Sequence, residues 1–397
     1  MAKVIVHIDL NAFFVRAEEI RNPSIEGKAV AIGHLGRGGI VSTCSYEARK
    51  YGVRSGMPMN KAVDLCPHLL ILPPDYRFYV TLSHEFKNYI RSITKKVESA
   101  SVDELFADFT DVVKGKKNIE AYFRSIQNTL YERTGLKCSI GVGPTKFLAK
   151  MGSDYQKPMG LTIIRRKNIK DILYPLPIDD MFGVGKKSAP RLKHVGIKTI
   201  GGLATALEND DEKVLNILGK FSVELKEWLR GYGSDEIITE WDDPKSIGNS
   251  TTLGEDTNSY DVIKSTLEML AEEISMRAKK EGMIGSTIQI MAKDTKYQAH
   301  NKSISFSTPT NKAIDIFNIA LKLYEKNFSD LTVRAIGITL QNLINIKDVS
   351  IQMTFFDYEQ HEEENKTKLL INEINRKLKG SPLKRASEVK NGNKRRD

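Results

Sequence analysis

The chain has 397 residues, too many for one compact domain, and this length favours roughly two to four domains. Lysine and arginine exceed aspartate and glutamate by 60 to 50, and the net charge of +10 suits a polyanionic partner without proving one. The scattered Cys44, Cys66 and Cys138 have neither disulfide nor metal-ligand spacing, and the sequence shows no signal peptide and no apolar run long enough to span a membrane. We therefore expect a cytoplasmic protein with reduced thiols and no membrane contact.

The first predicted element is a strand of apolar and β-branched residues, 4–8, that delivers Asp9. A second short strand delivers residues 101–104, which include Asp103 and Glu104. Three carboxylates from two strand ends suit a pair of Mg²⁺ ions in phosphoryl transfer, because this hard cation takes oxygen ligands. Adjacent residues on a regular strand point to opposite faces, so we predict that the second strand bends into a hairpin at this carboxylate pair. Taken singly, such residues are more often turn or helix caps than metal ligands.

Between and beyond these two strands, the pattern mixes strands with helices. A glycine-rich turn at residues 36–39 separates predicted strands at 28–33 and 40–45. Residues 75–165 alternate short apolar strands with amphipathic helices, including a strand at 139–143 and a following helix that carries Phe147 and Leu148. The N-terminal part of the chain is therefore expected to be of mixed α and β structure.

From about residue 166 to 235 the pattern turns helical. It contains Gly183 and Gly185 one residue apart, followed by Lys186 and Lys187. A Gly-x-Gly turn between helices exposes backbone N–H groups to which a phosphate can bind, and the two lysines add positive charge. A plain tight turn is the alternative, but the hydrophobic residues that follow favour a helix-hairpin-helix that contacts a duplex backbone.

Residues 236–246 are predicted to form a linker, after which the order of elements changes. The pattern predicts strands at 246–252, 284–293, 303–307 and 333–340, with helices marked by Ile263 to Ile274 and by Ile314 to Tyr324. A β-α-β-β-α-β order indicates an independent α+β unit.

Four segments in this order, residues 9–19, 45–58, 101–104 and 157–160, resemble motifs of the Y-family DNA polymerases, most closely of the bacterial branch called DNA polymerase IV. The resemblance covers nearly the whole chain. It implies an α+β, multidomain right-hand polymerase with palm, small fingers, helical thumb and little finger. The implied boundaries are 1–10 and 75–165 for the palm, 11–74 for the fingers, 166–235 for the thumb, 236–246 for the linker, 247–345 for the little finger and 346–397 for a C-terminal tail.

The resemblance also implies roles for individual residues. Asp9, Asp103 and Glu104 would be catalytic and, with the backbone carbonyl of Leu10, would hold two Mg²⁺ ions. The incoming nucleotide would be bound by Tyr46, Arg49 and Lys157, by backbone N–H groups near Phe13, and by Phe14 as the steric gate against ribonucleotides. Forked Arg and point-charge Lys contacts suit phosphate groups independently of the family. Gly183, Gly185, Lys186 and Lys187 would contact DNA.

The implied activity is template-directed, low-fidelity DNA synthesis across lesions, on primer–template DNA with dNTPs, by a protein expected to be a monomer. Beyond the C-terminal domain, no added carboxylate cluster resembles a proofreading exonuclease. Gln352, Met353, Phe355 and Phe356 are similar to the peptide by which bacterial polymerases bind the β subunit of the sliding clamp, although so short a motif also arises by chance. The basic C-terminal end is either a solubilising tail or a nonspecific phosphate contact.

Two rival functions stay open at this point. A nucleotide cyclase would share the three carboxylates, but it would need neither a helix-hairpin-helix nor a separate basic C-terminal domain. A DNA-binding protein without activity would keep the basic domains, but it would not need the carboxylates.

Overall fold

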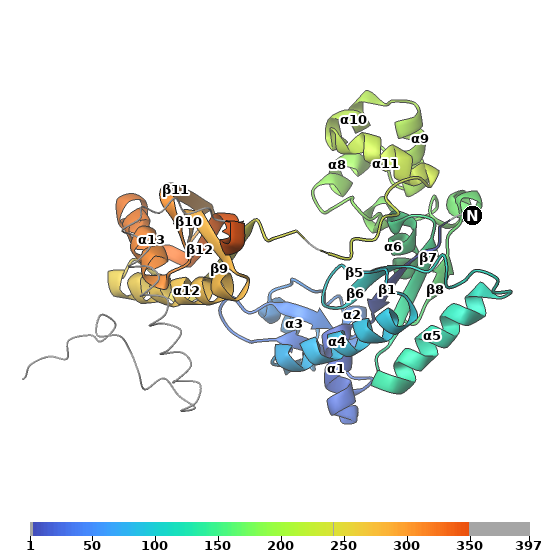
Figure 1. Ribbon diagram of the computed structural model, residues 1–397, viewed down its shortest axis with the longest axis horizontal. Coiled ribbons are helices and arrows are strands. Elements are labelled where there is room, and N and C mark those ends of the chain that lie inside the picture. Colours follow the sequence, from blue (N-terminus) through green and yellow to red (C-terminus); the bar gives the residue numbers. More distant parts are fainter. Residues whose placement is uncertain (1–2, 241, 349–397) are drawn as a thin grey trace, which may run out of the picture. The chain divides into compact units, whose positions relative to one another are not determined.

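The computed structural model describes residues 3–240 and 242–348 (Figure 1). The chain divides into two compact units, Met1–Asp242 and Asp243–Asp397, each with its own hydrophobic core. The predicted clamp-binding peptide and the rest of the C-terminal tail lie outside the described residues. Within the described residues, no helix is long and apolar enough to cross a membrane.

The first unit is built on a five-stranded sheet with the order β5-β6-β1-β7-β8. The bounds of its strands are Val97–Ser99 (β5), Glu104–Asp108 (β6), Ile5–Leu10 (β1), Cys138–Gly143 (β7) and Leu161–Ile163 (β8). The central strand β1 is buried along its whole length, which explains its continuous apolar run. The strands predicted at 4–8 and 139–143 are confirmed.

Helices cover both faces of this sheet. Val6, Ile8 and Leu10 pack with residues of α4 (Tyr76–Ile93) and α5 (Ile119–Thr134) in one core. The alternate residues of β1, His7 and Asp9, instead contact α6 (Lys146–Tyr155). Because side chains alternate along a strand, β1 places its apolar residues in the core and its polar ones against α6.

A three-stranded sheet of order β3-β2-β4 lies in the same unit, with bounds Val41–Cys44 (β3), Val30–Gly33 (β2) and Leu70–Leu72 (β4). It confirms the two strands predicted on either side of the 36–39 turn. Short helices connect it to the rest of the unit, with bounds Phe13–Arg21 (α1), Pro23–Ile25 (η1), Tyr46–Lys50 (α2) and Met59–Leu65 (α3).

The segment after β8 is helical, as predicted. Its bounds are Arg166–Asn168 (η2), Ile169–Ile172 (α7), Ile178–Asp180 (η3), Ser188–His194 (α8), Ile200–Glu208 (α9), Glu212–Leu218 (α10) and Phe221–Arg230 (α11). These helices share a core with Phe147, Leu148 and Met151 of α6. Helix α6 therefore packs on the five-stranded sheet with one side and on the helical segment with the other.

The segment between Arg230 and Ser246 contains no helix or strand among its described residues. Its beginning is nevertheless fixed to the first unit. The buried carboxylate of Glu98 accepts a hydrogen bond from the backbone N–H of Ile238 at 2.7 Å, and the Lys146 N–H donates to the carbonyl of Ser234 at 2.9 Å. The domain boundaries given above stay predictions.

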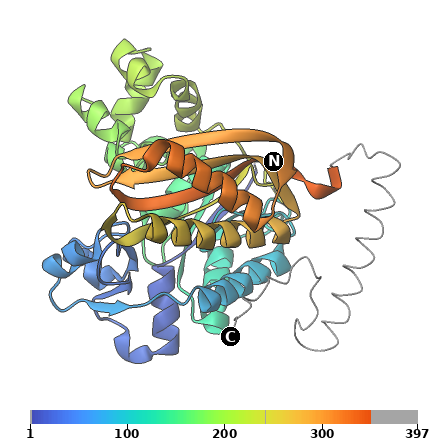
Figure 2. The ribbon, with the colours of Figure 1, turned by 90° about the vertical axis from the view of Figure 1, so that its left-hand side faces the viewer.

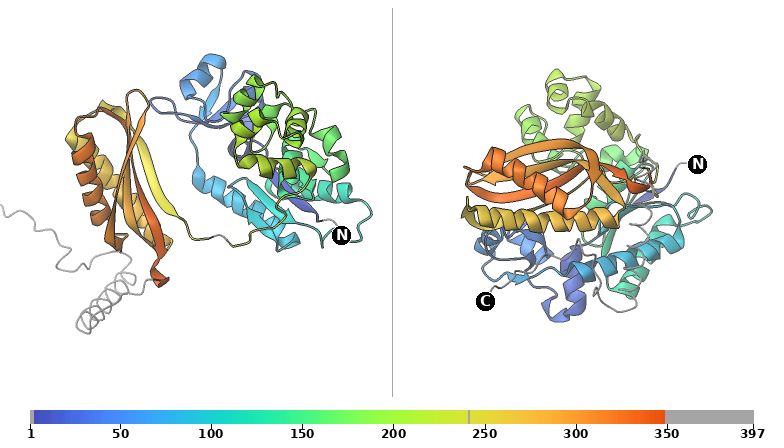
Figure 3. Two further views of the ribbon diagram at one scale, coloured as in Figure 1. Left: turned by 90° about the horizontal axis from the view of Figure 1, so that it is seen from above. Right: turned by 60° about the vertical axis from the view of Figure 1, so that its left-hand side comes forward.

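The second unit has the predicted β-α-β-β-α-β order. Its elements are β9 (Ser246–Thr257), α12 (Tyr260–Lys280), β10 (Met283–Asp294), β11 (Ala299–Thr310), α13 (Ala313–Phe328), β12 (Val333–Asn345) and η4 (Ile346–Asp348). The antiparallel sheet has the order β11-β10-β12-β9, and both helices pack on one of its faces (Figures 2 and 3). Strand β11 is longer than the predicted range of 303–307. Most of its side chains are exposed, so its sequence lacks the alternation of apolar and polar residues that would have marked its full length.

Candidate active site

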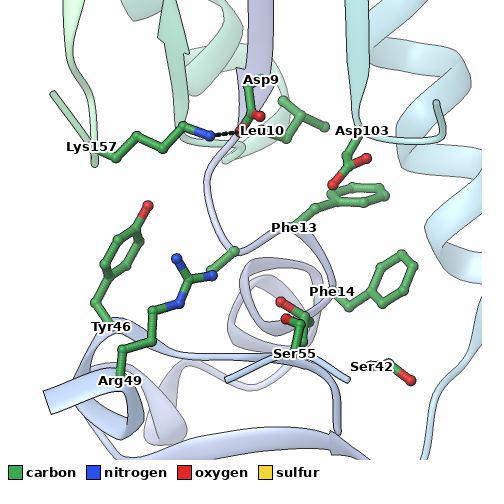
Figure 4. Close-up of a pocket in the computed structure, with 12 residues that line it drawn as sticks. Asp9, Leu10, Phe13, Phe14, Ser42, Tyr46, Arg49, Ser55, Asp103 and Lys157 are labelled. Atoms are coloured by element: carbon green, nitrogen blue, oxygen red, sulfur yellow. Dashed lines mark ion pairs between the residues drawn. The ribbon is translucent and has the colours of Figure 1, made fainter. Parts of the chain in front are cut away.

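One pocket of about 240 Å³ gathers residues from distant parts of the first unit (Figure 4). They come from the end of β1, the start of α1, strand β3, helix α2, the loop between α2 and α3, the turn before β6 and the loop after α6. The lining consists of Asp9, Leu10, Ala12, Phe13, Phe14, Ser42, Thr43, Tyr46, Arg49, Ser55, Asp103 and Lys157. All the predicted metal and nucleotide residues except Glu104 line this pocket.

Glu104 lies beside the pocket, opposite Asp9. The antiparallel register of β1 and β6 pairs these two residues, and their side chains form a hydrogen bond. Burial and the hydrogen bond with Asp9 raise the pKa of Glu104 to about 7, although Lys150 acts against them. Burial also acts to raise the pKa of Asp9, but the hydrogen bond from Glu104 and the lysines 150 and 157 outweigh it and hold that pKa below its usual value. Of the two carboxyl groups, Glu104 therefore takes up a proton more readily than Asp9.

Asp103 lies in the turn between β5 and β6, so the predicted hairpin bend is confirmed. Its backbone carbonyl accepts a hydrogen bond from the N–H of Leu10 at 3.0 Å, which fixes the turn against the end of β1. The hydroxyl of Ser101 donates to Asp103 Oδ1 at 2.6 Å. Figure 4 shows Asp103 on the side of Asp9 that faces away from Lys157.

The carboxylates suit a hard divalent cation, but they do not form a finished site. Throughout residues 3–240 and 242–348, no group of three or more His, Cys, Asp or Glu side chains is arranged to hold a metal ion. Asp9 and Glu104 come together as a pair, whereas Asp103 stays apart and accepts the Ser101 hydroxyl. Their oxygens are the ligands that Mg²⁺ prefers, and two carboxylates in contact need a cation if both are to ionise.

Lys150, on α6, is a site residue that the sequence analysis missed. Its Nζ atom lies 2.6 Å from Glu104 Oε1, 3.4 Å from Asp9 Oδ2 and 3.4 Å from Asp154 Oδ2. One signal was available in the sequence, because Lys150 interrupts an apolar run in the predicted helix, and the structure buries that run almost completely. A lysine in such a helix needs a charged partner. The pocket hydroxyls of Ser42, Thr43 and Ser55 were also missed, and nothing in the sequence distinguishes them from other strand and turn hydroxyls.

Cationic and aromatic side chains lie across the pocket from the carboxylates. Arg49 stacks its guanidinium group on the Tyr46 ring, 4.7 Å from the ring centroid, and Figure 4 shows both on the opposite side of the pocket from Asp9. Helix α2 presents them because Ser45 caps its first turn by accepting the Ala48 N–H. Lys157 joins the two sides, since its Nζ lies 2.8 Å from Asp9 Oδ1 and 2.8 Å from Asp154 Oδ1.

The start of α1 forms the wall between these groups. Phe13 is buried in the core, whereas Phe14 is half-buried and stacks on Tyr79 with ring centroids 4.4 Å apart. Tyr79 is held in turn by a hydrogen bond that its hydroxyl donates to Glu18 at 2.7 Å. The first N–H groups of a helix have no partner within it, so the beginning of α1 offers the pocket free donors as well as an aromatic ring.

The predicted DNA-contacting turn lies between η3 and α8. Gly183, Gly185, Lys186 and Lys187 are all exposed, while Val184 between the glycines is buried. The positive φ of Gly183, +90°, and the 2.9 Å that would separate an added Cβ from the Phe221 ring explain why glycine stands there. No neighbouring atom restricts Gly185 in this way.

His7 and Ser153 lie behind the carboxylates. His7 is fully buried, and burial, followed by the charge on Lys150, keeps its pKa well below the usual value, so the ring is neutral. Its Nδ1 atom lies 2.7 Å from the hydroxyl oxygen of Ser153 on α6. Sequence reasoning did not single out either residue.

Comparison with known proteins adds the following similarities. Family models match three parts of the chain: the impB/mucB/samB family at residues 8–154, its HHH motif at 166–197 and its C-terminal domain at 244–355. The chain is 34% identical to DNA polymerase IV of Bacillus velezensis over 98% of its own length and 94% of that protein. It is 35% identical to DNA polymerase IV 1 of Bacillus subtilis, covering 98% of this chain and 96% of that one.

Solved structures agree with the sequence relatives. The fold is similar to that of a Y-family DNA polymerase chimera of Dbh and Dpo4, with a TM-score of 0.74 and 29% identity over 86% of this chain and 99% of the chimera.

Proposed function

Since the chain belongs to the Y-family of DNA polymerases and is a template-directed translesion DNA polymerase, we propose that its pocket performs nucleotidyl transfer with two Mg²⁺ ions. The observation that carries this proposal is that the Asp9–Glu104 pair lies beside the pocket that also holds Tyr46, Arg49 and Lys157. Acidic oxygens for cations and basic groups for phosphates meet there. In such a reaction, the primer 3′-hydroxyl attacks the α-phosphate of the nucleotide and pyrophosphate leaves.

Asp9, Asp103, Glu104 and the carbonyl of Leu10 would hold the two ions. Once bound, the ions would lower the pKa of the primer hydroxyl and neutralise charge on the phosphates. The all-oxygen donor set and the pairing of Asp9 with Glu104 across the two strands support a divalent cation at this position. Asp103 has to approach Asp9 and Glu104 to complete this site. Because Asp103 lies in a turn, a local movement of that turn is enough.

Tyr46, Arg49 and Lys157 would bind the β- and γ-phosphates, assisted by the free N–H groups near Phe13. Lys157 would then exchange its contacts with Asp9 and Asp154 for the triphosphate. Phe14 would be the steric gate: it lines the pocket, and its stacking on Tyr79 holds the ring where a ribose 2′-hydroxyl would collide with it.

The partners of the protein would be primer–template DNA, dNTPs and the sliding clamp. Exposed Gly183, Gly185, Lys186 and Lys187 would contact the duplex backbone, and residues 352–356 would bind the β subunit of the clamp. We also propose that the protein works as a monomer in the cytoplasm, and that it synthesises DNA with low fidelity and without a proofreading exonuclease.

Primer extension tests the proposal against its rivals. Purified protein is incubated with a labelled primer–template, Mg²⁺ and dNTPs, alongside Asp103→Ala. The polymerase proposal predicts extension by the parent and none by the variant, with DNA binding retained. Binding without extension by the parent would indicate a passive DNA-binding protein, and a cyclised nucleotide would indicate a cyclase.

A further inference from the structure

His7 carries a buried ring nitrogen without a hydrogen-bond partner. The ring packs against Phe106 of β6, with centroids 4.5 Å apart, and Nδ1 lies 2.7 Å from Ser153 Oγ. Its other nitrogen, Nε2, makes no hydrogen bond with any described residue. A buried polar atom without a partner is uncommon and costs free energy, so this nitrogen calls for an explanation.

The surroundings of Ser153 favour one of the two neutral forms of the ring. Ser153 Oγ also lies 2.8 Å from the backbone carbonyl of Lys150, which can only accept, and we assign the hydroxyl proton to that carbonyl. With this assignment Ser153 Oγ offers His7 only lone pairs, and Nδ1 is the donor in their 2.7 Å contact. A charged ring at zero exposure would need a hydrogen-bonded anion, but the carboxylate oxygen recorded nearest to Nε2, Glu104 Oε2, is 3.8 Å away. In the assigned form of the ring, Nε2 is an acceptor without a donor.

The carboxylate that faces this nitrogen also holds a charged donor, the ammonium group of Lys150. Glu104 contacts the lysine Nζ with Oε1 at 2.6 Å and faces His7 Nε2 with Oε2 at 3.8 Å. The ammonium group and the bare nitrogen thus lie against the same carboxylate. The lysine occupies the oxygens of Glu104 and Asp9 that a divalent cation would use.

We propose that His7 is a positioning residue for Lys150, an inference that rests on the proposed polymerase function. When Asp9 and Glu104 take up divalent cations, the Lys150 ammonium group leaves them and donates a hydrogen bond to His7 Nε2. The acceptor keeps the lysine charge close to the site without blocking the carboxylates. Without it, the one alternative partner of the lysine among the described residues is Asp154, and the lysine competes with the cations for Asp9 and Glu104.

Three variants separate the two nitrogens of the ring. His7→Asn keeps an N–H donor near the Nδ1 position but has no acceptor at the position of Nε2. His7→Gln can place its amide oxygen near the Nε2 position and lacks the Nδ1 donor. Ser153→Ala removes the partner of Nδ1 and leaves Nε2 in place. If His7 only supported the fold, cation binding would not single out His7→Asn among the three variants.

The test measures equilibrium binding of Mn²⁺ to the DNA-free protein by electron paramagnetic resonance of the unbound ion. We expect His7→Asn to weaken binding about 10-fold, which corresponds to ~1.4 kcal/mol. His7→Gln and Ser153→Ala should stay within about 3-fold of the parent, and a thermal melt of each variant reports folding. Lys150→Met should bind Mn²⁺ more tightly than the parent, and adding His7→Asn to it should have no further effect.

Three results would overturn the proposal. The first is a folded His7→Asn variant that binds Mn²⁺ as tightly as the parent. The second is that His7→Asn weakens Mn²⁺ binding equally in the parent and in Lys150→Met. The third is that Lys150→Met binds Mn²⁺ no more tightly than the parent. The last result applies even if His7→Asn fails to fold. Primer extension by the parent is read separately: its absence refutes the polymerase proposal, whereas extension combined with any of these three results refutes only the role of His7.

Discussion

Lys157 forms an ion pair with Asp9 across the candidate active site, with Nζ 2.8 Å from Oδ1. The same ammonium group lies 2.8 Å from Asp154 Oδ1, so it bridges an expected metal ligand and a surface carboxylate. Lys157 therefore belongs both to the group that would bind the cations and to the group that would bind the triphosphate. It neutralises the carboxylate before substrate binds, and it is close enough to the pocket to contact a triphosphate afterwards.

Replacing Lys157 should therefore affect both nucleotide and metal binding. Lys157→Ala removes a charge-assisted contact, and we expect kcat/KM for dNTP to fall by about 10- to 100-fold, from a loss of ~1.5–3 kcal/mol. It should also shift the Mg²⁺ dependence, because Asp9 loses its closest cation. Arg49→Ala is the matched control: it should lower kcat/KM for dNTP similarly and leave the Mg²⁺ dependence unchanged. Identical metal profiles for the two variants would contradict this role of Lys157.

Removing the ring of Phe14 should relax sugar selection. A clash with a 2′-hydroxyl costs about 1–3 kcal/mol, as other overpacked contacts do, so Phe14→Ala should raise ribonucleotide incorporation about 10- to 100-fold relative to deoxynucleotide incorporation. Single-nucleotide insertion kinetics with matched rNTP and dNTP measure the ratio. Tyr79→Phe keeps the stacked ring and should retain the parental ratio. Equal sugar discrimination in Phe14→Ala and the parent would refute the gate.

Deleting residues 352–356 should separate recruitment from chemistry. The peptide lies outside the described residues, so this prediction depends on the sequence motif alone. The deletion should abolish the stimulation of processive synthesis by the sliding clamp and spare insertion of a single nucleotide without the clamp. A truncated protein that the clamp still stimulates would show that binding resides elsewhere.

The cysteines should resist modification in the folded protein. All three are free and buried, and burial raises the pKa of Cys138 to about 12 and that of Cys44 above its usual value. A raised pKa leaves the thiol protonated at pH 8, whereas the reactive species is the thiolate. Because all three thiols are buried, Ellman's reagent should react only as fast as the protein unfolds, and with all three thiols in denaturant. Rapid, stoichiometric labelling of native protein would contradict the burial of these side chains.

The sequence predicted the elements of the site better than the contacts between them. Residues 4–8 were predicted as a strand because four of the five are apolar and β-branched. Asp103 was predicted to lie in a bend because two adjacent carboxylates cannot share a face of a regular strand. The hydrogen bond of Asp9 with Glu104 depends on the register of β1 against β6, and a shift of one residue would place Asp103 opposite Asp9 instead. A single sequence does not determine that register.

Lys150, Ser153 and His7 show the second limit. Each was hidden in a segment whose pattern was already explained by packing: His7 in the apolar strand, and Lys150 and Ser153 in the helix that carries Phe147 and Leu148. Their roles depend on α6 lying against the face of β1 that carries Asp9, which is a tertiary contact. Unlike an apolar residue, a buried polar one has to be explained by its partner, and that partner is distant in the sequence.

The central claim is that Asp9, Asp103 and Glu104 gather two divalent cations beside a nucleotide. The most direct test is the anomalous signal of Mn²⁺ in crystals of the protein with a dideoxy-terminated primer–template and the next dNTP. We predict two Mn²⁺ peaks bound by these carboxylates, with Asp103 moved toward the other two. Mn²⁺ found only on the phosphates, with Asp9 and Glu104 still joined to Lys150 and Lys157, would contradict the account.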